Sequence, residues 1–170
     1  MIEELISEYK NLFGNKKMIL LRSLLCYYRT PNYRVVVLIR CLLKQKSTFM
    51  RKLYRKKLVV KYGVEIGIKP QIGKNLRIKH FQGIVIGNDV ILGDNCILYQ
   101  QVTLGQKNNS YPKIGNNVTV FAGAKVLGNI TVGDNCVIGA NAVVLKNIPS
   151  DKCAVGVPCK ITDKRILIYE

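Results

Sequence analysis

The sequence contains a single histidine, no tryptophan and no Cys-x-x-Cys pair. Structural zinc sites draw on clusters of Cys and His, so one His and six scattered Cys exclude the common zinc modules. Cysteines in apolar stretches are more often small buried hydrophobes than ligands. We therefore expect no bound metal, free thiols and a reducing cytoplasm.

Long uninterrupted apolar runs are also missing. The two most apolar stretches, residues 18–28 and 34–43, are broken by Arg22 and Arg40, and neither reaches the ~20 residues that a membrane-spanning helix needs. Residues 1–14 are acidic and lack a small-residue cleavage site, unlike a signal peptide. We expect a cytoplasmic protein without a transmembrane segment, with the inner face of the membrane as an alternative location.

Acidic residues are scarce, with 10 Asp+Glu against 27 Lys+Arg and a net charge of +17. Residues 1–62 alone hold 15 Lys+Arg and three Glu. A dense basic run lies among apolar residues and comprises Lys44, Lys46, Arg51, Lys52, Arg55, Lys56, Lys57 and Lys61. This run is either a solvated helix face or a basic amphipathic helix that suits an anionic membrane. We expect no nucleic-acid binding, because no recognition motif accompanies the charge.

The apolar residues of the N-terminal third recur at intervals of three and four, which is helical spacing. Leu20, Leu24 and the sequence around Leu42 follow it. The segment Thr30-Pro31-Asn32 interrupts the pattern and suits a helix start. We predict two or three helices in a small, basic N-terminal segment over residues 1–62.

After Tyr62 an aliphatic residue returns every six positions, with two interruptions. The thirteen positions are Ile66, Ile72, Ile78, Ile86, Leu92, Leu98, Leu104, Ile114, Val120, Val126, Val132, Ile138 and Val144. A mostly small or apolar residue stands two positions before each of them, and Gly often follows. One hexapeptide cannot close a core, but three make a triangular coil, and stacked coils bury the aliphatic column. The sequence predicts an all-β solenoid, a parallel β-helix, over residues 63–161, with a C-terminal tail over 162–170.

The two interruptions locate candidate functional loops, because loops on a rigid scaffold are where function concentrates. Two extra residues stand between Ile78 and Ile86, and four between Leu104 and Ile114. The first interruption holds His80. Imidazole titrates near neutrality and can accept a proton from an attacking hydroxyl, so we read His80 as a general base, with a surface histidine of no role as the alternative.

A catalytic imidazole needs an acidic partner to orient it and to stabilise its charged form. Glu65 precedes His80 by 15 residues, which is close to the ~18 residues of one coil in such a repeat. Glu65 and His80 are therefore candidates for a catalytic dyad.

The stretch from 63 to about 161 resembles serine O-acetyltransferases and related polysaccharide O-acetyltransferases of the hexapeptide-repeat acyltransferase superfamily. The matching segments begin with His80-Phe81-Gln82-Gly83 and continue over 84–87, 101–105, 112–115, 123–128, 139–144 and 154–161. The resemblance implies a left-handed β-helix, acetyl-CoA-dependent acetyl transfer, homotrimers with active sites between subunits, and acetyl-CoA lying along the edge of the helix.

The resemblance also assigns roles by position. It makes His80 the catalytic base and Glu65 its carboxylate partner. It places small residues along the CoA arm, namely Gly105, Ala122, Gly123 and Ala140. It places two basic residues, Lys146 and Lys160, near the CoA phosphates. Alternatively, the small residues only form the corners of turns, and the lysines are solvated surface charges.

Two departures from the family pattern bear on the acceptor. Lys79 stands where the family has Asp before the catalytic His, and Ser110-Tyr111 stands where serine acetyltransferases have Arg-His. Charged pairs carry the recognition of a zwitterionic amino acid. We therefore expect a sugar hydroxyl of a surface polysaccharide as acceptor, with Lys79 and Tyr111 beside it, or with Tyr111 packed at the base of its loop. Serine acetylation in cysteine biosynthesis and a non-catalytic scaffold are the alternatives.

Overall fold

The computed structural model describes residues 1–163, so most of the predicted tail lies outside the described residues. Four helices come first: α1 (Ile2–Phe13), α2 (Ile19–Arg29), α3 (Pro31–Lys44) and α4 (Thr48–Tyr62). The predicted number of two or three helices was too low, because the spacing of apolar residues does not show two of the helix boundaries. Gly14, with a φ of 77°, ends α1, and the side chain of Ser47 caps α4 by accepting from the Met50 amide at 3.4 Å. No helix within residues 1–163 has both the length and the apolar character needed to cross a bilayer.

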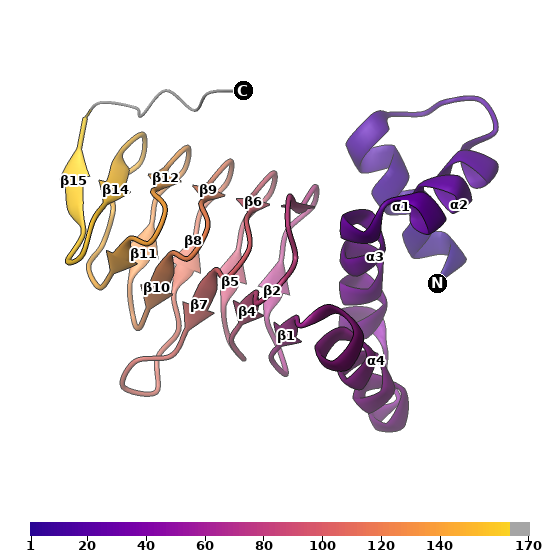
Figure 1. The fold of residues 1–170 in the computed structure, drawn as a ribbon, viewed down its shortest axis with the longest axis horizontal. Coiled ribbons are helices and arrows are strands. Elements are labelled where there is room, and N and C mark those ends of the chain that lie inside the picture. Colours follow the sequence, from indigo (N-terminus) through magenta and orange to yellow (C-terminus); the bar gives the residue numbers. More distant parts are fainter. Residues whose placement is uncertain (164–170) are drawn as a thin grey trace.

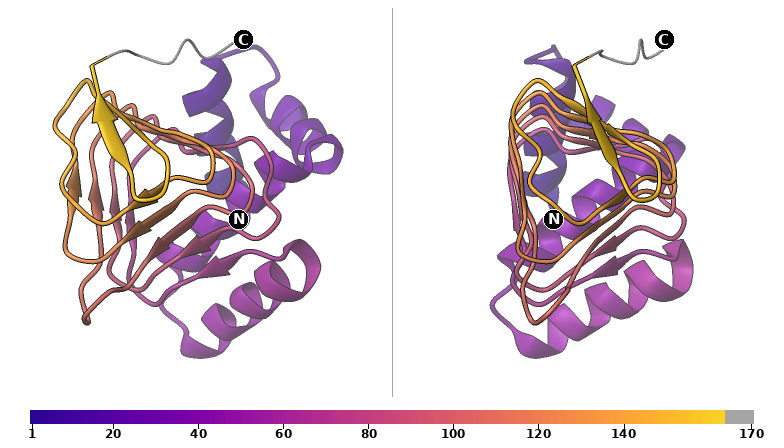
Figure 2. Two further views of the ribbon diagram at one scale, coloured as in Figure 1. Left: turned by 60° about the vertical axis from the view of Figure 1, so that its left-hand side comes forward. Right: turned by 90° about the vertical axis from the view of Figure 1, so that its left-hand side faces the viewer.

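The strands form the predicted prism. They are β1 (Glu65–Ile66), β2 (Gln71–Ile72), β3 (Arg77–Ile78), β4 (Val85–Ile86), β5 (Ile91–Leu92), β6 (Ile97–Leu98), β7 (Thr103–Gly105), β8 (Lys113–Ile114), β9 (Thr119–Val120), β10 (Lys125–Leu127), β11 (Thr131–Val132), β12 (Val137–Ile138), β13 (Val143–Val144), β14 (Cys153–Val155) and β15 (Lys160–Thr162). Each coil gives one strand to each of three parallel sheets (Figures 1 and 2).

We call the sheets A (β1-β4-β7-β10-β13), B (β2-β5-β8-β11) and C (β3-β6-β9-β12-β14-β15). Viewed along its axis the prism is triangular (Figure 2). The chain passes from sheet C to sheet A at what we name the His80 corner, from A to B at the loop corner, and from B to C at the asparagine corner. Only β15 runs antiparallel, against β14, at the C-terminal end of the described prism.

The hexapeptide column is confirmed position by position. Each of the thirteen aliphatic residues is the second residue of one of the strands β1 to β13, and all are buried except the half-buried Ile72. The small residues two positions earlier, including Cys96 and Cys136, are buried as well. Burying an aliphatic side chain contributes roughly 1.5–3 kcal/mol, so the repeated column accounts for the stability of a prism whose strands are so short.

The asparagine corner contains a feature that the aliphatic periodicity does not show. Asn75, Asn95, Asn117 and Asn135 adopt left-handed backbone conformations there, with φ between 56° and 61°. Asn tolerates this region better than most residues. Their side chains also stack in a ladder, with Asn75 donating to Asn95 at 2.9 Å and Asn117 to Asn135 at 3.0 Å.

Helices α3 and α4 cover the N-terminal end of the prism (Figure 1). Leu42 and Leu58 join the same buried cluster as Ile66 and Leu76. The open edge of the first coil would otherwise present unpaired carbonyls, which invite pairing with another chain. Arginines of the helices occupy that edge instead.

Candidate active site

His80 lies in the first interruption, two residues after β3 and before β4, at the His80 corner. Its side chain is exposed. The imidazole lies 6.4 Å from the ring of Tyr99, which in turn stacks on Phe121 at 4.8 Å. The His80 side chain makes no hydrogen bond among residues 1–163.

A ladder of backbone hydrogen bonds continues from this corner toward the C-terminus. Gln101 N donates to Gln82 O at 2.8 Å, Gly123 N to Gln100 O at 2.9 Å, and Asn141 N to Ala122 O at 2.9 Å. Residues 82, 100, 122 and 140 are therefore stacked on successive coils. The predicted CoA contacts Ala122, Gly123 and Ala140 lie on the same corner of the prism as His80.

Lys160 belongs to the same corner at its far end. It pairs with Val155 in the antiparallel strand, and Val155 follows Ala154, whose carbonyl accepts from Gly139 N at 2.8 Å. Gly139 immediately precedes Ala140. The structure thus brings six predicted site residues to one edge of the molecule, namely Lys79, His80, Ala122, Gly123, Ala140 and Lys160.

Three other predicted site residues, Gly105, Lys146 and Tyr111, lie at the loop corner. Gly105 ends β7, and Lys146 follows β13 on the same side of sheet A. Between β7 and β8 the chain forms the loop that projects from the prism in Figure 1. Within one chain, sheet A separates Gly105, Lys146 and Tyr111 from the His80 corner.

Tyr111 lies at the base of this loop. Its hydroxyl donates to Gln106 Oε1 at 3.0 Å, and its ring covers Gly87, where an added Cβ would lie 2.5 Å from Cε1. This geometry agrees with the alternative in which Tyr111 packs at the base of its loop. A contact with an acceptor stays a prediction.

Glu65 opens β1 and pairs with Val85 of β4, which lies in the next coil. The residue that precedes it by two, Gly63, accepts from Gly83 N at 2.9 Å, so this part of the chain also lies beside the His80 corner. The Glu65 side chain is exposed and makes no hydrogen bond with His80 in the described chain. The corner brings the two residues to neighbouring coils, and the dyad itself stays a prediction.

The small side chains have local packing reasons. Gly123 has a φ of 72°, and a Cβ there would lie 2.0 Å from Asn141 Oδ1. A Cβ on Gly105 would lie 2.9 Å from Leu127 Cδ2. The turn itself requires glycine at 123, whereas Gly105 ends β7, where an added Cβ would meet only the ends of side chains. Ala140 is exposed and Ala122 half-buried, which leaves the edge accessible to a ligand.

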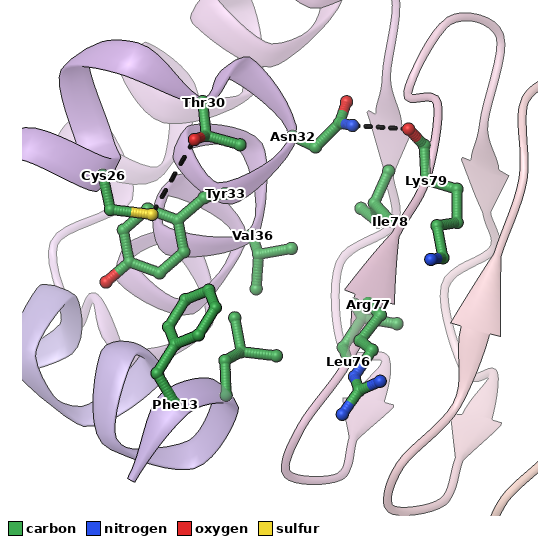
Figure 3. A pocket seen from close by; sticks show the side chains of 11 residues that line it. Phe13, Cys26, Thr30, Asn32, Tyr33, Val36, Leu76, Arg77, Ile78 and Lys79 are labelled. Atoms are coloured by element: carbon green, nitrogen blue, oxygen red, sulfur yellow. Dashed lines mark hydrogen bonds between the residues drawn. The ribbon is translucent and has the colours of Figure 1, made fainter. Parts of the chain in front are cut away.

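Sequence reasoning missed a contact that reaches the His80 corner from the helices. Asn32, at the start of α3, donates its side-chain amide to the carbonyl of Lys79, the residue before His80 (Figure 3). The Lys79 side chain is exposed. A cavity of about 220 Å³ lies beside this contact, between the helices and β3. Only the helix-start signal Thr30-Pro31-Asn32 pointed to this segment.

Gln100 is a second residue that the sequence did not single out. It is stacked between Gln82 and Ala122 at the His80 corner, and its carboxamide oxygen is buried without a hydrogen-bond partner in the described residues. Buried acceptors are nearly always paired, so this oxygen needs an explanation. A donor on a ligand at this edge would provide one.

The architecture is that of a hexapeptide-repeat protein: a triangular parallel β-helix, a helical cap, and an imidazole in a break of the repeat. Residues 111–146 match the family model described as bacterial transferase hexapeptide (six repeats). The serine acetyltransferase of Synechococcus elongatus is 41% identical over 148 residues, which cover 83% of this chain and 59% of the relative. That of Staphylococcus xylosus is 49% identical over 100 residues, covering 56% and 46%. The chain thus spans between about half and three-fifths of the length of these curated relatives.

Solved structures agree. Serine acetyltransferase from Vibrio cholerae superimposes with a TM-score of 0.77 at 29% identity, covering 94% of this chain and 65% of that one. The soybean enzyme complexed with serine gives 0.78 at 25%, with 94% and 68% covered. The resemblance and the fold class predicted from the sequence, a left-handed parallel β-helix with a small helical segment, are confirmed.

Proposed function

We propose that the chain is an acetyl-CoA-dependent O-acetyltransferase with His80 as its general base. The observation that carries the proposal is the position of His80: the chain's one imidazole lies exposed in a break of the repeat, at the start of an accessible edge that continues past Ala122 and Ala140. Similarity to serine acetyltransferases supports the same activity. A scaffold without catalysis would have no need of this arrangement.

The chemistry is a transfer between two nucleophiles. A ring nitrogen of His80 accepts the proton of the acceptor's hydroxyl group while the hydroxyl oxygen attacks the acetyl carbonyl carbon. The tetrahedral intermediate then collapses, the carbon–sulfur bond breaks, and the imidazolium returns the proton to the CoA thiolate. Glu65 stabilises the imidazolium, and a backbone N–H near the second interruption stabilises the oxyanion. No metal takes part in these steps.

Acetyl-CoA fits the edge at the His80 corner. Ala122 and Ala140 leave room for an extended arm. The buried oxygen of Gln100 lacks a partner among the described residues, and a change of rotamer would offer it to an amide N–H of the ligand. Lys160 and Lys146 provide cations for phosphates, as the resemblance implies. Each lysine is exposed, so binding a phosphate would not require a buried charge to be uncovered.

We propose a homotrimer, as the resemblance implies, and the separation of the two corners supports it. Within one chain, His80 and Lys160 lie across sheet A from Gly105, Lys146 and the loop that holds Tyr111. A site that uses both groups is complete only where the His80 corner of one copy meets the loop corner of another. A closed ring of three copies satisfies every such pairing, because each interface is head-to-tail.

Serine is the acceptor that the comparisons favour, and the expectation of a polysaccharide sugar is not supported by any relative named above. A sugar hydroxyl stays as the second candidate because of one observation. The loop offers Ser110-Tyr111, with Tyr111 bound to Gln106, in place of the Arg-His that grips a zwitterion, and Lys79 replaces an acidic residue.

One assay tests the activity and separates the acceptors. The protein is incubated with acetyl-CoA and serine, hexoses, N-acetylhexosamines or oligosaccharides, and release of the CoA thiol is followed, with His80→Ala as control. Turnover with serine alone supports the first candidate, and turnover with sugars alone supports the second. Full activity of His80→Ala would remove the proposed base, and no turnover with any acceptor would favour the scaffold.

We also propose a cytoplasmic location with peripheral contact to an anionic membrane. The basic residues of 1–62 support it, and no nucleic acid is invoked.

A further inference from the structure

Helix α4 has an inward face that is fully used by the prism. Leu58 is buried, and the ring of Tyr62 meets that of Phe81 edge-on at 5.6 Å. Arg55 donates to the carbonyls of Gly67 at 2.7 Å and Ile66 at 3.2 Å. Arg51 donates to the carbonyl of Ile68. Both arginines of the helix are therefore occupied in capping the first coil.

The outward face of α4 carries three exposed apolar side chains. Phe49 is 68% exposed, Leu53 44% and Val60 76%. Their spacing of four and seven residues places them on one stripe of the helix. Exposed lysines flank this stripe on both sides, namely Lys52, Lys56, Lys57 and Lys61.

These lysines have no anionic neighbours along the chain, because no Asp or Glu occurs between Glu8 and Glu65. Of the basic run at 44–61, Lys44 is the one member with an ion pair in the described residues, to Glu4 at 2.8 Å. Lys61 lies 5.9 Å from the ring of Tyr62. The charge of the outward face is therefore not neutralised within residues 1–163.

We propose that the outward face of α4 binds the surface of a bilayer that contains anionic phospholipids. An apolar stripe flanked by lysines suits a helix lying in the plane of the interface. Lysine stems cover apolar surface while their ammonium groups reach the headgroups. Arginine is the residue that recognises phosphates in fixed geometry on nucleic acids and proteins, and here both arginines of α4 point inward. Lysines alone fit a fluid layer of headgroups.

The proposed surface lies at the same end of the molecule as the catalytic base. Val60 is two residues from Tyr62, whose ring contacts Phe81, the residue after His80. A bilayer bound to α4 would therefore lie close to the His80 corner. The binding itself does not depend on the proposed acetyl transfer, so the two stand or fall separately.

The test is co-sedimentation of the full chain with two kinds of vesicle, phosphatidylcholine alone and phosphatidylcholine mixed with phosphatidylglycerol. We expect binding to the mixed vesicles only, and weaker binding at high salt. The triple substitution Lys52→Glu, Lys56→Glu and Lys57→Glu should lower the partition coefficient by on the order of a hundredfold or more.

A charge-matched control separates this face from the net charge of +17. The substitutions Lys69→Glu, Lys74→Glu and Lys113→Glu change exposed lysines of the prism by the same total. The control should lose no more than a few-fold in partition. Equal losses in the two triple variants would overturn the proposal, as would binding of wild type to neutral vesicles alone.

A second variant probes the apolar stripe. Phe49→Ser, Leu53→Ser and Val60→Ser remove exposed side chains, so the far-UV circular dichroism should not change. We expect this variant to lose vesicle binding even at low salt. If wild type binds no vesicle and this variant instead breaks up an assembly seen by light scattering, the face is a contact between copies and the membrane proposal is wrong.

Discussion

Arg40 joins the helical cap to the first coil, and replacing it with Met tests how much that junction contributes. Its Nε lies 2.7 Å from Glu8 Oε1, its Nη1 donates to the Ile72 carbonyl at 2.6 Å, and its Nη2 donates to Gly73 O. The two charged side chains are only 11% and 4% exposed. Removing one partner of a buried pair costs about 3–5 kcal/mol, because the other charge is left without compensation.

We expect Arg40→Met to lower the free energy of unfolding by that amount, measured by urea denaturation followed by circular dichroism. Glu8 Oε2 already lacks a hydrogen-bond partner among the described residues, so no neighbouring group there can replace the guanidinium as a partner of the Glu8 carboxylate. The double variant Glu8→Leu, Arg40→Met should lose clearly less than the sum of the single changes, by about 0.5–3 kcal/mol. Arg22→Met, at an exposed arginine, is the control and should stay within about 0.5 kcal/mol of wild type. Strict additivity, or a loss at Arg40 no larger than that of the control, would refute the reasoning.

Three further predictions concern single positions. Asn32→Ala releases the Lys79 carbonyl and should lower kcat about three- to tenfold with little change in KM, as expected for one hydrogen bond that positions the base; an unchanged kcat and pH–rate profile would contradict this. Gln100→Leu removes a buried, unpaired oxygen, so it should raise the KM for acetyl-CoA without lowering the melting temperature; an unchanged KM would exclude a ligand contact. Burial raises the pKa of the Cys96 thiol from 9.0 to about 11, so iodoacetamide at neutral pH should leave Cys96 unmodified until the protein is unfolded. The same shift means that this thiol's contribution to stability is complete below about pH 9 and is lost as the pH rises toward 11.

The sequence predicts the prism well because each hexapeptide contains an aliphatic residue that marks its buried position. An aliphatic residue such as Leu98 can be buried only at one position of its coil, and the next such position follows six residues later. The breaks around His80 and Tyr111 are visible for the same reason, as departures from a strict count. Their placement on different corners also follows from that count, but only when each strand is assigned to a sheet, which the bare periodicity does not do.

The helical cap is harder to predict, because composition does not reveal which way a side chain points. Arg51 and Lys52 are adjacent and carry the same charge, yet Arg51 binds a carbonyl of the first coil and Lys52 is exposed. That difference depends on how α4 docks on β1, which is a tertiary property. The Asn32–Lys79 contact is of the same kind, since 47 residues separate its partners. Glu65 and His80 show a further limit of sequence-based prediction. Their spacing places them on neighbouring coils, but a contact between their side chains depends on rotamers that the spacing does not determine.

The separation of the His80 corner from the loop corner leads to a last prediction. If each active site is formed by two copies, a chain with His80→Ala lacks the base but still offers an intact loop corner. A chain with Lys146→Glu, at an exposed residue, offers the base but repels the CoA phosphates. Each variant alone should be inactive at acetyl-CoA concentrations below the KM of the Lys146 variant.

Subunit exchange between the two variants should then restore activity. In a cyclic trimer assembled at random from equal amounts, about one interface in four joins an intact His80 corner to an intact loop corner in the required order. We therefore expect about a quarter of wild-type turnover after unfolding and refolding the mixture together, and none after mixing without exchange. If each chain holds a complete site, both defects stay confined to their own chains and co-refolding restores nothing, which would place Lys146 outside the shared site or the site within one copy.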